Sequence, residues 1–309
     1  MLANFFDKTK PINSIVLVVI FFSFYTIYRF HQQPAAFIDF TTFESLAHII
    51  CSALFLFISG LVFMKNGISR GNLHSSFLMI LLYGAFPSAF ELNKTLVVVF
   101  LYLLIYKNIS QLKTIGKTQL LLFDSGILAG ISFLIFDWSL LFFLFIYIGL
   151  FYSKKIDFRN LVSPLLGLII PSILYFTYCF LMDNTGLFYN RFNFIYSLDT
   201  TMYQNLSIKI PLIVISITTG IAIISVLPKI ISVSNNYRFQ YLLIVAMLFI
   251  GCLLIIISPQ KNGSELLYVF IPVAVVLGRF LKSIPKNKVK ETFLMALTLF
   301  SIALLCYRL

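Results

Sequence analysis

The chain has 309 residues, of which 60% are hydrophobic and only 11% are charged, and its formal net charge is +12. A soluble domain of this size carries a polar, charged exterior, and these few charges cannot cover one, so the composition indicates an integral membrane protein. The basic residues lie in short segments between apolar runs, without the single patch and interleaved aromatics of a nucleic-acid-binding surface, so no nucleic-acid partner is expected.

The apolar runs predict an all-α, polytopic bundle of membrane-spanning helices. A helix needs about 20 apolar residues to cross the hydrocarbon core of a bilayer. On that basis about eleven spans are expected within one transmembrane domain over residues 1–309, at residues 11–28, 43–64, 75–90, 92–106, 119–136, 138–152, 161–182, 210–228, 241–257, 266–281 and 292–307. The first run resembles a signal peptide but lacks a clear small-residue cleavage site, so it is expected to remain as a span.

The four predicted spans within residues 75–152 are short and form two tight helical hairpins, with Glu91 and Asp137 at their tips. Fifteen residues of helix rise only about 22 Å, less than the roughly 30 Å of the hydrocarbon core. We therefore expect both tips to lie below the external surface, facing a cavity rather than lipid. Gly126 and Gly130, spaced as GxxxG, predict a close approach between helices.

Lys and Arg alternate between dense and sparse segments along these spans. Seventeen of the 23 fall in every second segment: Lys8, Lys10, Lys65, Arg70, Lys107, Lys113, Lys117, Lys154, Lys155, Arg159, Lys229, Arg238, Arg279, Lys282, Lys286, Lys288 and Lys290. The segments between them hold Arg29, Lys94, Arg191, Lys209, Lys261 and Arg308. Because loops rich in Lys and Arg stay in the cytoplasm, this predicts a bacterial cytoplasmic (inner) membrane protein with a cytoplasmic N-terminus and an external C-terminus. Basic loops also suit an anionic leaflet, so membrane lipids are expected partners.

Most acidic residues fall on the predicted external side: Asp39, Glu44, Glu91, Asp137, Asp183, Asp199 and Glu265. One interpretation is that acids accumulate where basic residues are excluded. Alternatively, an external cleft holds a carboxylate base or a ligand for a divalent metal. Asp39 is the leading candidate base, because partial burial between Ile38 and Phe40 would raise its pKa. Arg191 and Lys261 are isolated cations on that face and candidate phosphate binders.

The stretch at residues 122–176, which begins LFDSGILAGISFLIFDWSLLFF, together with the opening MLANFFDKTKPINSIV, resembles an uncharacterised family of bacterial multi-pass proteins. More distantly it is similar to GT-C type glycosyltransferases that use polyprenyl-phosphate-linked sugars. This second resemblance implies a lipid-linked donor used on the external face. It implies a catalytic acid in the first external loop, Asp39 or, as second choice, Glu44. It also places Glu91 and Asp137 beside the cleft and Arg191 facing the donor phosphate.

Three functions therefore stay open. The first is a glycosyltransferase-like protein that uses a lipid-linked sugar, and the second is a non-enzymatic subunit or assembly factor of a larger envelope complex. The third is a transporter, which usually carries an ionisable residue inside the membrane, and Asp124 is the one candidate. The sequence holds no HExxH, P-loop, GxSxG or metal-spaced Cys/His cluster, so no metal site is predicted. A divalent metal or a polyprenyl-phosphate lipid stays open only through the resemblance and the acidic face.

Overall fold

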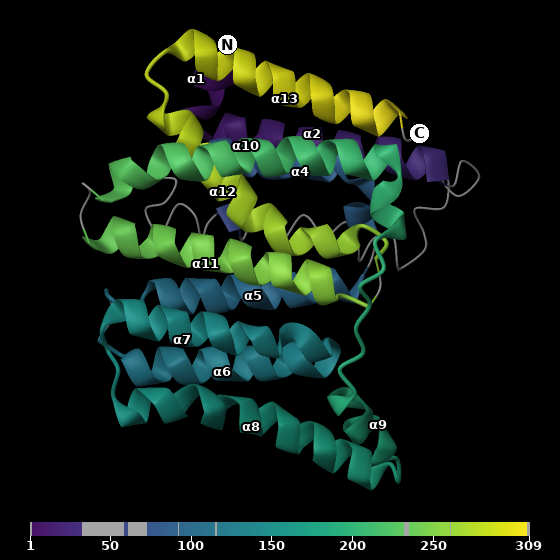
Figure 1. Cartoon of the computed structure of the whole chain (residues 1–309), viewed down its shortest axis with the longest axis vertical. Coiled ribbons are helices and arrows are strands. Elements are labelled where there is room, and N and C mark those ends of the chain that lie inside the picture. The colour runs from purple at the N-terminus through teal and green to yellow at the C-terminus, as the bar shows by residue number, and fades with distance from the viewer. Residues whose placement is uncertain are drawn as a thin grey trace. The chain divides into compact units, whose positions relative to one another are not determined.

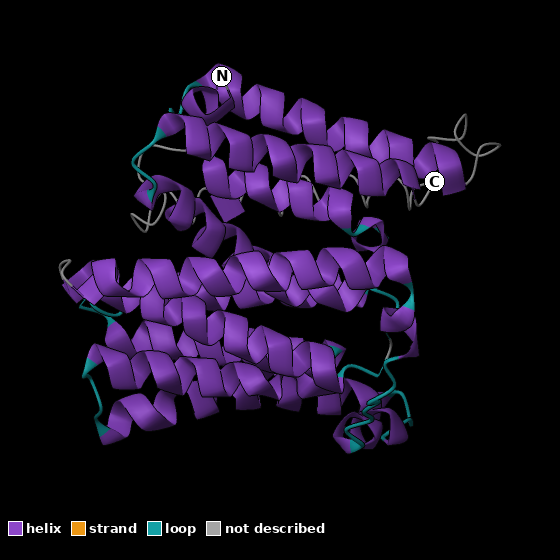
Figure 2. Cartoon of the chain, turned by 45° about the horizontal axis from the view of Figure 1, so that its top comes forward, coloured by secondary structure: helices purple, strands orange, loops and turns teal. Residues whose placement is uncertain are grey.

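The computed structural model describes residues 2–32, 59–60, 73–91, 93–114, 116–231, 235–259 and 261–307. These residues form helices, turns and loops, and no strand occurs among them (Figure 2). The predicted all-α class is therefore confirmed. The chain divides into two compact units: unit 1 comprises Met1–Leu92, Asp199–Val233 and Lys261–Leu309, and unit 2 comprises Asn93–Leu198 and Ser234–Gln260.

Unit 1 is built around the short helix α4 (Figure 1). Its elements are α1 (Leu2–Phe6), α2 (Pro11–Gln32), α4 (His74–Ala85), η2 (Pro87–Phe90), η5 (Thr201–Gln204), α10 (Leu206–Ile231), η6 (Ser264–Leu266), α12 (Leu267–Ser283) and α13 (Asn287–Tyr307). α4 contacts α2, α12 and α13, and nearly all of its residues are buried. Tyr83 on α4 is fully buried, and its ring packs against Phe21, Phe90 and Phe270.

Unit 2 contains α5 (Lys94–Ser110), α6 (Thr118–Ile135), η3 (Asp137–Leu140), α7 (Leu141–Ser153), α8 (Phe158–Leu181), α9 (Gly186–Tyr189), η4 (Asn190–Phe192) and α11 (Asn235–Ile257). Tyr102 on α5 stacks on Phe142 on α7 with ring centroids 4.1 Å apart, and its hydroxyl lies 3.5 Å from the Met247 carbonyl oxygen on α11. Offset aromatic stacking adds to the stabilisation that burial alone gives. Three helices distant in sequence thus share one core.

The most extensive helix contact in unit 2 joins α6 to α8. A β-carbon at Gly126 would clash with the Pro164 carbonyl, and one at Gly167 would clash with the Phe123 carbonyl. A β-carbon at Gly130 would lie 2.6 Å from Pro171 Cγ. The GxxxG spacing therefore does permit a close approach, because small residues let helix backbones meet. The partner helix is α8.

Seven described helices are long and apolar enough to cross a membrane: Pro11–Phe30, Thr118–Ile135, Phe158–Leu181, Leu206–Pro228, Asn235–Ile257, Ser264–Ser283 and Asn287–Cys306. These candidate spans are consistent with an integral membrane protein, and the count of about eleven stays a prediction. The predicted span at residues 43–64 lies outside the described residues except for 59–60, which are helical. α4 has 12 residues and rises only about 18 Å. That residues 1–309 form one transmembrane domain stays a prediction.

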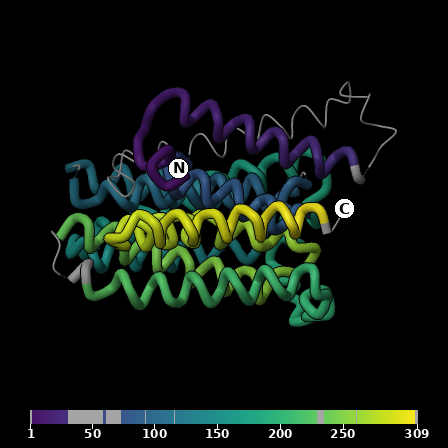
Figure 3. The backbone as a smooth tube through the Cα atoms, turned by 90° about the horizontal axis from the view of Figure 1, so that it is seen from above, coloured from purple at the N-terminus to yellow at the C-terminus, as the bar shows by residue number. Residues whose placement is uncertain are grey.

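Only one of the two predicted hairpins lies within a single unit. α6, η3 and α7 follow one another in unit 2 and pack together, so the second hairpin is present with Asp137 at its tip. The helices of the first predicted hairpin, α4 and α5, belong to different units. Within unit 1, α2 and α13 run in the same direction, so the described ends of the chain lie at opposite ends of this unit (Figure 3).

Each unit has one densely basic end. In unit 1 this end carries α1 and the α12–α13 turn, with Lys8, Lys10, Lys282, Lys286, Lys288 and Lys290. In unit 2 it carries the α5–α6 and α7–α8 turns and the start of α11, with Lys107, Lys113, Lys117, Lys154, Lys155, Arg159 and Arg238. We call these the basic ends and the opposite ones the acidic ends. The helix connectivity thus reproduces, within each unit, the alternation of basic segments in the sequence.

Candidate functional site

The structure sorts the six predicted site residues into three groups. Asp39 and Glu44 lie outside the described residues. Glu91 and Lys261 lie at the acidic end of unit 1. Asp137 and Arg191 lie at the acidic end of unit 2. Each pair is therefore considered within its own unit.

In unit 1, Glu91 directly follows η2 and is half-buried. Its Oε1 accepts a hydrogen bond of 3.4 Å from the Tyr28 hydroxyl on α2. Lys261 is also half-buried, and its Nζ lies 6.0 Å from the centroid of the Tyr203 ring. This is the outer limit of a cation–π contact, so Lys261 is held only loosely.

Glu265 of η6 is the most deeply buried described carboxylate of this end, at 1% exposure. Its Oε1 accepts a hydrogen bond from the Tyr203 hydroxyl, and its Oε2 accepts one of 2.8 Å from the backbone N–H of Gly263. Burial and the Glu265 carboxylate together raise the pKa of the Tyr203 hydroxyl. The sequence places Glu265 on the external side but gives it no role. The Asn262–Gly263 pair, where Gly263 has φ of +92°, is the only local signal of a tight turn that buries it.

In unit 2, Asp137 begins η3 and is half-buried, and Arg191 lies in η4. Burial raises the pKa of the Asp137 carboxyl above its usual range, and the Arg191 charge opposes that shift. The two charges therefore act on each other. Arg191 directly precedes Phe192 and Asp137 begins the short helix that ends at Leu140, and both Phe192 and Leu140 line one apolar pocket. Asp137 and Arg191 thus belong to the same end of unit 2, whereas the predicted cleft that also includes Glu91 stays a prediction.

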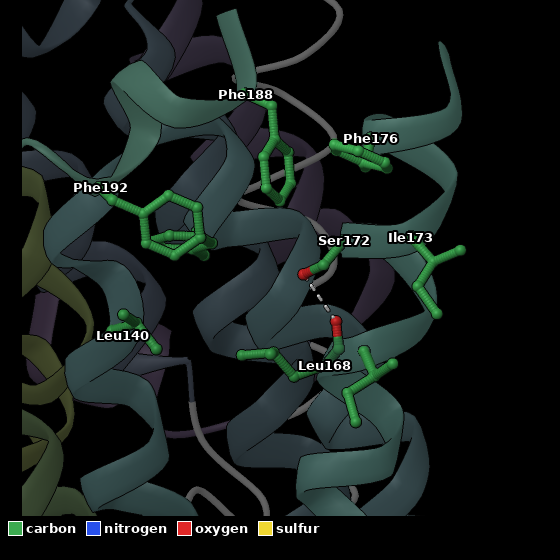
Figure 4. Close-up of a pocket in the computed structure, with 9 residues that line it drawn as sticks. Leu140, Leu168, Ser172, Ile173, Phe176, Phe188 and Phe192 are labelled. Carbon is green, nitrogen blue, oxygen red and sulfur yellow. Dashed lines mark hydrogen bonds between the residues drawn. The ribbon is translucent and has the colours of Figure 1, made fainter. Parts of the chain in front are cut away.

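The pocket has a volume of about 410 Å³ (Figure 4). We call it the aromatic pocket; it is lined by Phe133, Leu140, Leu168, Ile169, Ser172, Ile173, Phe176, Phe188 and Phe192. Ser172 donates a 3.0 Å hydrogen bond to the Leu168 carbonyl oxygen, so its hydroxyl is already satisfied (Figure 4). The lining therefore offers no free polar side chain to a ligand. The volume of the pocket falls within the range of small-molecule sites, about 300–1,000 Å³.

The segment after α8 forms one wall of this pocket. Phe188 on α9 packs edge to face on Phe176, with ring centroids 5.2 Å apart, and Phe192 packs on Phe133 at 5.4 Å. The indole N–H of Trp138 donates a 2.9 Å hydrogen bond to the Ile195 carbonyl oxygen. These contacts hold the segment after α8 against α6, η3 and α8 itself. The sequence shows only that this loop is aromatic, because which helices its rings meet depends on the tertiary fold.

In the part of the chain that the structure describes, no three His, Cys, Asp or Glu side chains come together as a metal centre would need. The acidic end of unit 2 instead combines an apolar pocket with one guanidinium and one carboxyl group. Such a site can take a long hydrocarbon chain and hold an anionic group beside it, because Arg binds phosphate through a planar fork of donors.

The chain was compared with known proteins. A family of unknown function (DUF6427) matches it over residues 1–309. No curated protein and no solved structure matches it. The resemblance to GT-C glycosyltransferases therefore stays a prediction, whereas the resemblance to an uncharacterised family is confirmed. The chain belongs to the family of unknown function DUF6427.

Proposed function

We propose that this membrane protein binds an anionic long-chain lipid, of the polyprenyl-phosphate class, at the acidic end of unit 2. One observation supports this proposal: Arg191 directly precedes Phe192, which lines the aromatic pocket. The hydrocarbon chain occupies the pocket, and the phosphate pairs with Arg191.

The position of the pocket on α8 favours a lipid over a water-soluble ligand. α8 is a candidate membrane span, and most of its side chains are not covered by the protein. Two residues of the pocket, Ile173 and Phe192, are 57% and 49% exposed. In a bilayer the exposed side chains of α8, such as Ile173, face hydrocarbon, so a lipid tail can enter the pocket sideways without crossing water.

Asp137 gives the site a means of discriminating between headgroups. Its carboxyl interacts with Arg191, and burial makes its charged form costly. An anionic phosphate that pairs with Arg191 favours protonation of Asp137, because like charges in one site disfavour each other. A protonated Asp137 then donates a hydrogen bond to a phosphate or sugar oxygen.

A glycosyltransferase-like activity extends this proposal. In such a reaction the bond between the sugar carbon and the phosphate oxygen breaks, and a bond forms between that carbon and an acceptor oxygen. The acceptor proton passes to a carboxylate base; Asp39 and Glu44, which the resemblance implies for that role, lie outside the described residues. Arg191 stabilises the phosphate leaving group.

The second candidate function is a non-enzymatic subunit of an envelope complex. The segment after η4 favours it, because Ile195, Tyr196 and Leu198 lie outside the seven long spans and are 64–65% exposed. Exposed apolar side chains of this kind mark protein or membrane contacts. Tyr196→Ala with Leu198→Ala is expected to release a co-purifying envelope protein, and purification of the unsubstituted protein from its membrane with no such partner would argue against this candidate.

Lipid binding is tested with the purified full chain in phosphatidylcholine nanodiscs, using labelled polyprenyl phosphate and neutral polyprenol as probes. Arg191→Gln removes a charge-assisted contact and is expected to weaken polyprenyl phosphate binding about tenfold or more, without affecting polyprenol. Lys94→Gln, an exposed cation at the same end of unit 2, is the matched control.

The pocket itself is tested with Ser172→Phe, which fills it and is expected to weaken the binding of both probes. Thr177→Phe is the control, since Thr177 lies on α8, is exposed and does not line the pocket. Unchanged binding in both Arg191→Gln and Ser172→Phe would refute the proposal.

A further inference from the structure

Three basic side chains from separate segments converge at the basic end of unit 2, far along the helices from the aromatic pocket. Lys113 lies in the turn after α5, Lys154 follows the last residue of α7, and Arg238 lies in the first turn of α11. We call them the Lys113 cluster. The Nζ of Lys113 lies 4.7 Å from the centroid of the Phe239 ring, which directly follows Arg238.

A second contact ties Lys154 to the same place. Its neighbour Lys155 donates hydrogen bonds to the Leu112 carbonyl oxygen, at 2.5 Å, and to Thr118 Oγ1, at 2.9 Å. Leu112 directly precedes Lys113, so the α7–α8 turn is fastened to the α5–α6 turn. The convergence therefore rests on specific contacts.

The cluster gathers like charges that the protein does not neutralise. Lys113 is half-buried, and burial, followed by the charges of Lys154 and Arg238, lowers the pKa of its ammonium group. Within the described residues, no carboxylate lies within 4.0 Å of any of the three cations. Lys154 also adopts a left-handed backbone with φ of 59°, where glycine is the easier residue.

Membrane topology alone does not explain this arrangement. The topological rule requires basic residues in a segment, not that three segments bring them together. Lys107, Lys117 and Arg159 lie at the same end of unit 2, yet they are not among the charges that act on Lys113. They provide a matched set of basic residues outside the cluster.

We propose that the Lys113 cluster binds a phosphate group at the basic end of unit 2. The Arg238 guanidinium offers a planar fork of donors, and the two ammonium groups add point charges, which together suit a phosphate. The group belongs either to an anionic lipid headgroup or to free phosphate. This site is independent of the lipid site proposed at the acidic end.

The test uses the full chain in phosphatidylcholine nanodiscs that contain a small fraction of phosphatidylglycerol, with native mass spectrometry to measure bound phosphatidylglycerol. The triple variant Lys113→Gln, Lys154→Gln, Arg238→Gln is compared with Lys107→Gln, Lys117→Gln, Arg159→Gln, which loses the same charge at the same end. The first variant loses the charge-assisted contacts to the phosphate, so it is expected to bind phosphatidylglycerol on the order of a hundredfold more weakly. The control is expected to change little.

Thermal unfolding in phosphatidylcholine alone checks that both variants fold. Millimolar inorganic phosphate that displaces phosphatidylglycerol from the unsubstituted protein identifies free phosphate as a ligand, and a lack of displacement identifies the lipid headgroup. Equal losses in the two triple variants would show a general effect of charge and overturn the proposal. Undiminished binding in the first variant would overturn it as well.

Discussion

The Tyr203 hydroxyl donates a hydrogen bond to the Glu265 carboxylate across a sequence separation of 62 residues. This bond joins η5 to η6 within unit 1, and the Gly263 backbone N–H supplies a second donor to the same carboxylate. A carboxylate as deeply buried as Glu265 needs such donors, since an unsatisfied buried charge is costly.

Tyr203→Phe is therefore expected to destabilise the protein by about 1–3 kcal/mol, because it removes one of the two donors from a buried charged group. Thermal unfolding in detergent, followed by tryptophan fluorescence or light scattering, measures the change. Tyr196→Phe is the control, because Tyr196 is 64% exposed. If the two variants unfold at the same temperature, the hydrogen bond contributes nothing to stability.

Gly126→Ala is expected to destabilise unit 2 by about 1–3 kcal/mol, since the added methyl group would clash with the Pro164 carbonyl, which is backbone and cannot rotate away. Gly220→Ala on α10 is the matched control, because nothing lies within 4 Å of its added β-carbon. Alanine is the better helix former, so this control is expected to be neutral or stabilising. Comparable losses in both variants would contradict the close packing of α6 on α8.

Much of the helical pattern could be predicted from the sequence, because long apolar runs have few alternatives in a membrane protein. The predicted spans at residues 161–182 and 292–307 correspond to α8 (Phe158–Leu181) and α13 (Asn287–Tyr307). The ends differ by several residues, since helices continue into polar turns that hydropathy does not mark. The α5 helix, for example, extends to Ser110.

The candidate site could be predicted only in part. Asp137 and Arg191 stand out in the sequence as isolated charges, and the structure places both at the acidic end of unit 2. The aromatic pocket could not be found, because Phe133, Phe176 and Phe192 come from three segments whose apolar character is shared by most of the chain. The burial of Glu265 depends on a donor 62 residues away, which no local pattern reveals.

The pH dependence of stability offers a test of the Asp137 environment. Asp137 lies at the tip between α6 and α7, and burial raises the pKa of its carboxyl in the folded protein despite Arg191. A raised folded-state pKa means that the folded protein favours the protonated carboxyl. The stabilisation that Asp137 gives to the folded state is therefore present at low pH and is lost as pH rises through the folded-state pKa.

Asp137→Asn mimics the protonated form, so it is expected to stabilise the protein at neutral pH and to make no difference once the carboxyl is protonated. Arg191→Gln removes the opposing charge and is expected to raise the pKa of Asp137 further. Thermal unfolding between about pH 4 and pH 8 measures both effects. Asp137→Asn that destabilises the protein at neutral pH would show that attraction to Arg191 outweighs the cost of burial.

The topology prediction can be checked with reporter fusions. The basic ends predict a cytoplasmic N-terminus, and the parallel course of α2 and α13 in unit 1 carries the end of α13 to the opposite end of that unit. A fluorescent protein that matures only in the cytoplasm is expected to fluoresce when fused before residue 1 and to stay dark after residue 309. Fluorescence at both fusion points would contradict an odd number of crossings.

The central claim, that the aromatic pocket of unit 2 binds an anionic long-chain lipid, is tested most directly by photocrosslinking. A polyprenyl phosphate with a photoactivatable group in its chain is added to the protein in nanodiscs, and mass spectrometry locates the labelled peptides. We expect labelling to concentrate on residues 168–176 of α8 and on residues 188–192, and to be reduced by Ser172→Phe and by excess unlabelled polyprenyl phosphate. Labelling spread evenly over the exposed faces of α10 and α13 and insensitive to Ser172→Phe would contradict it.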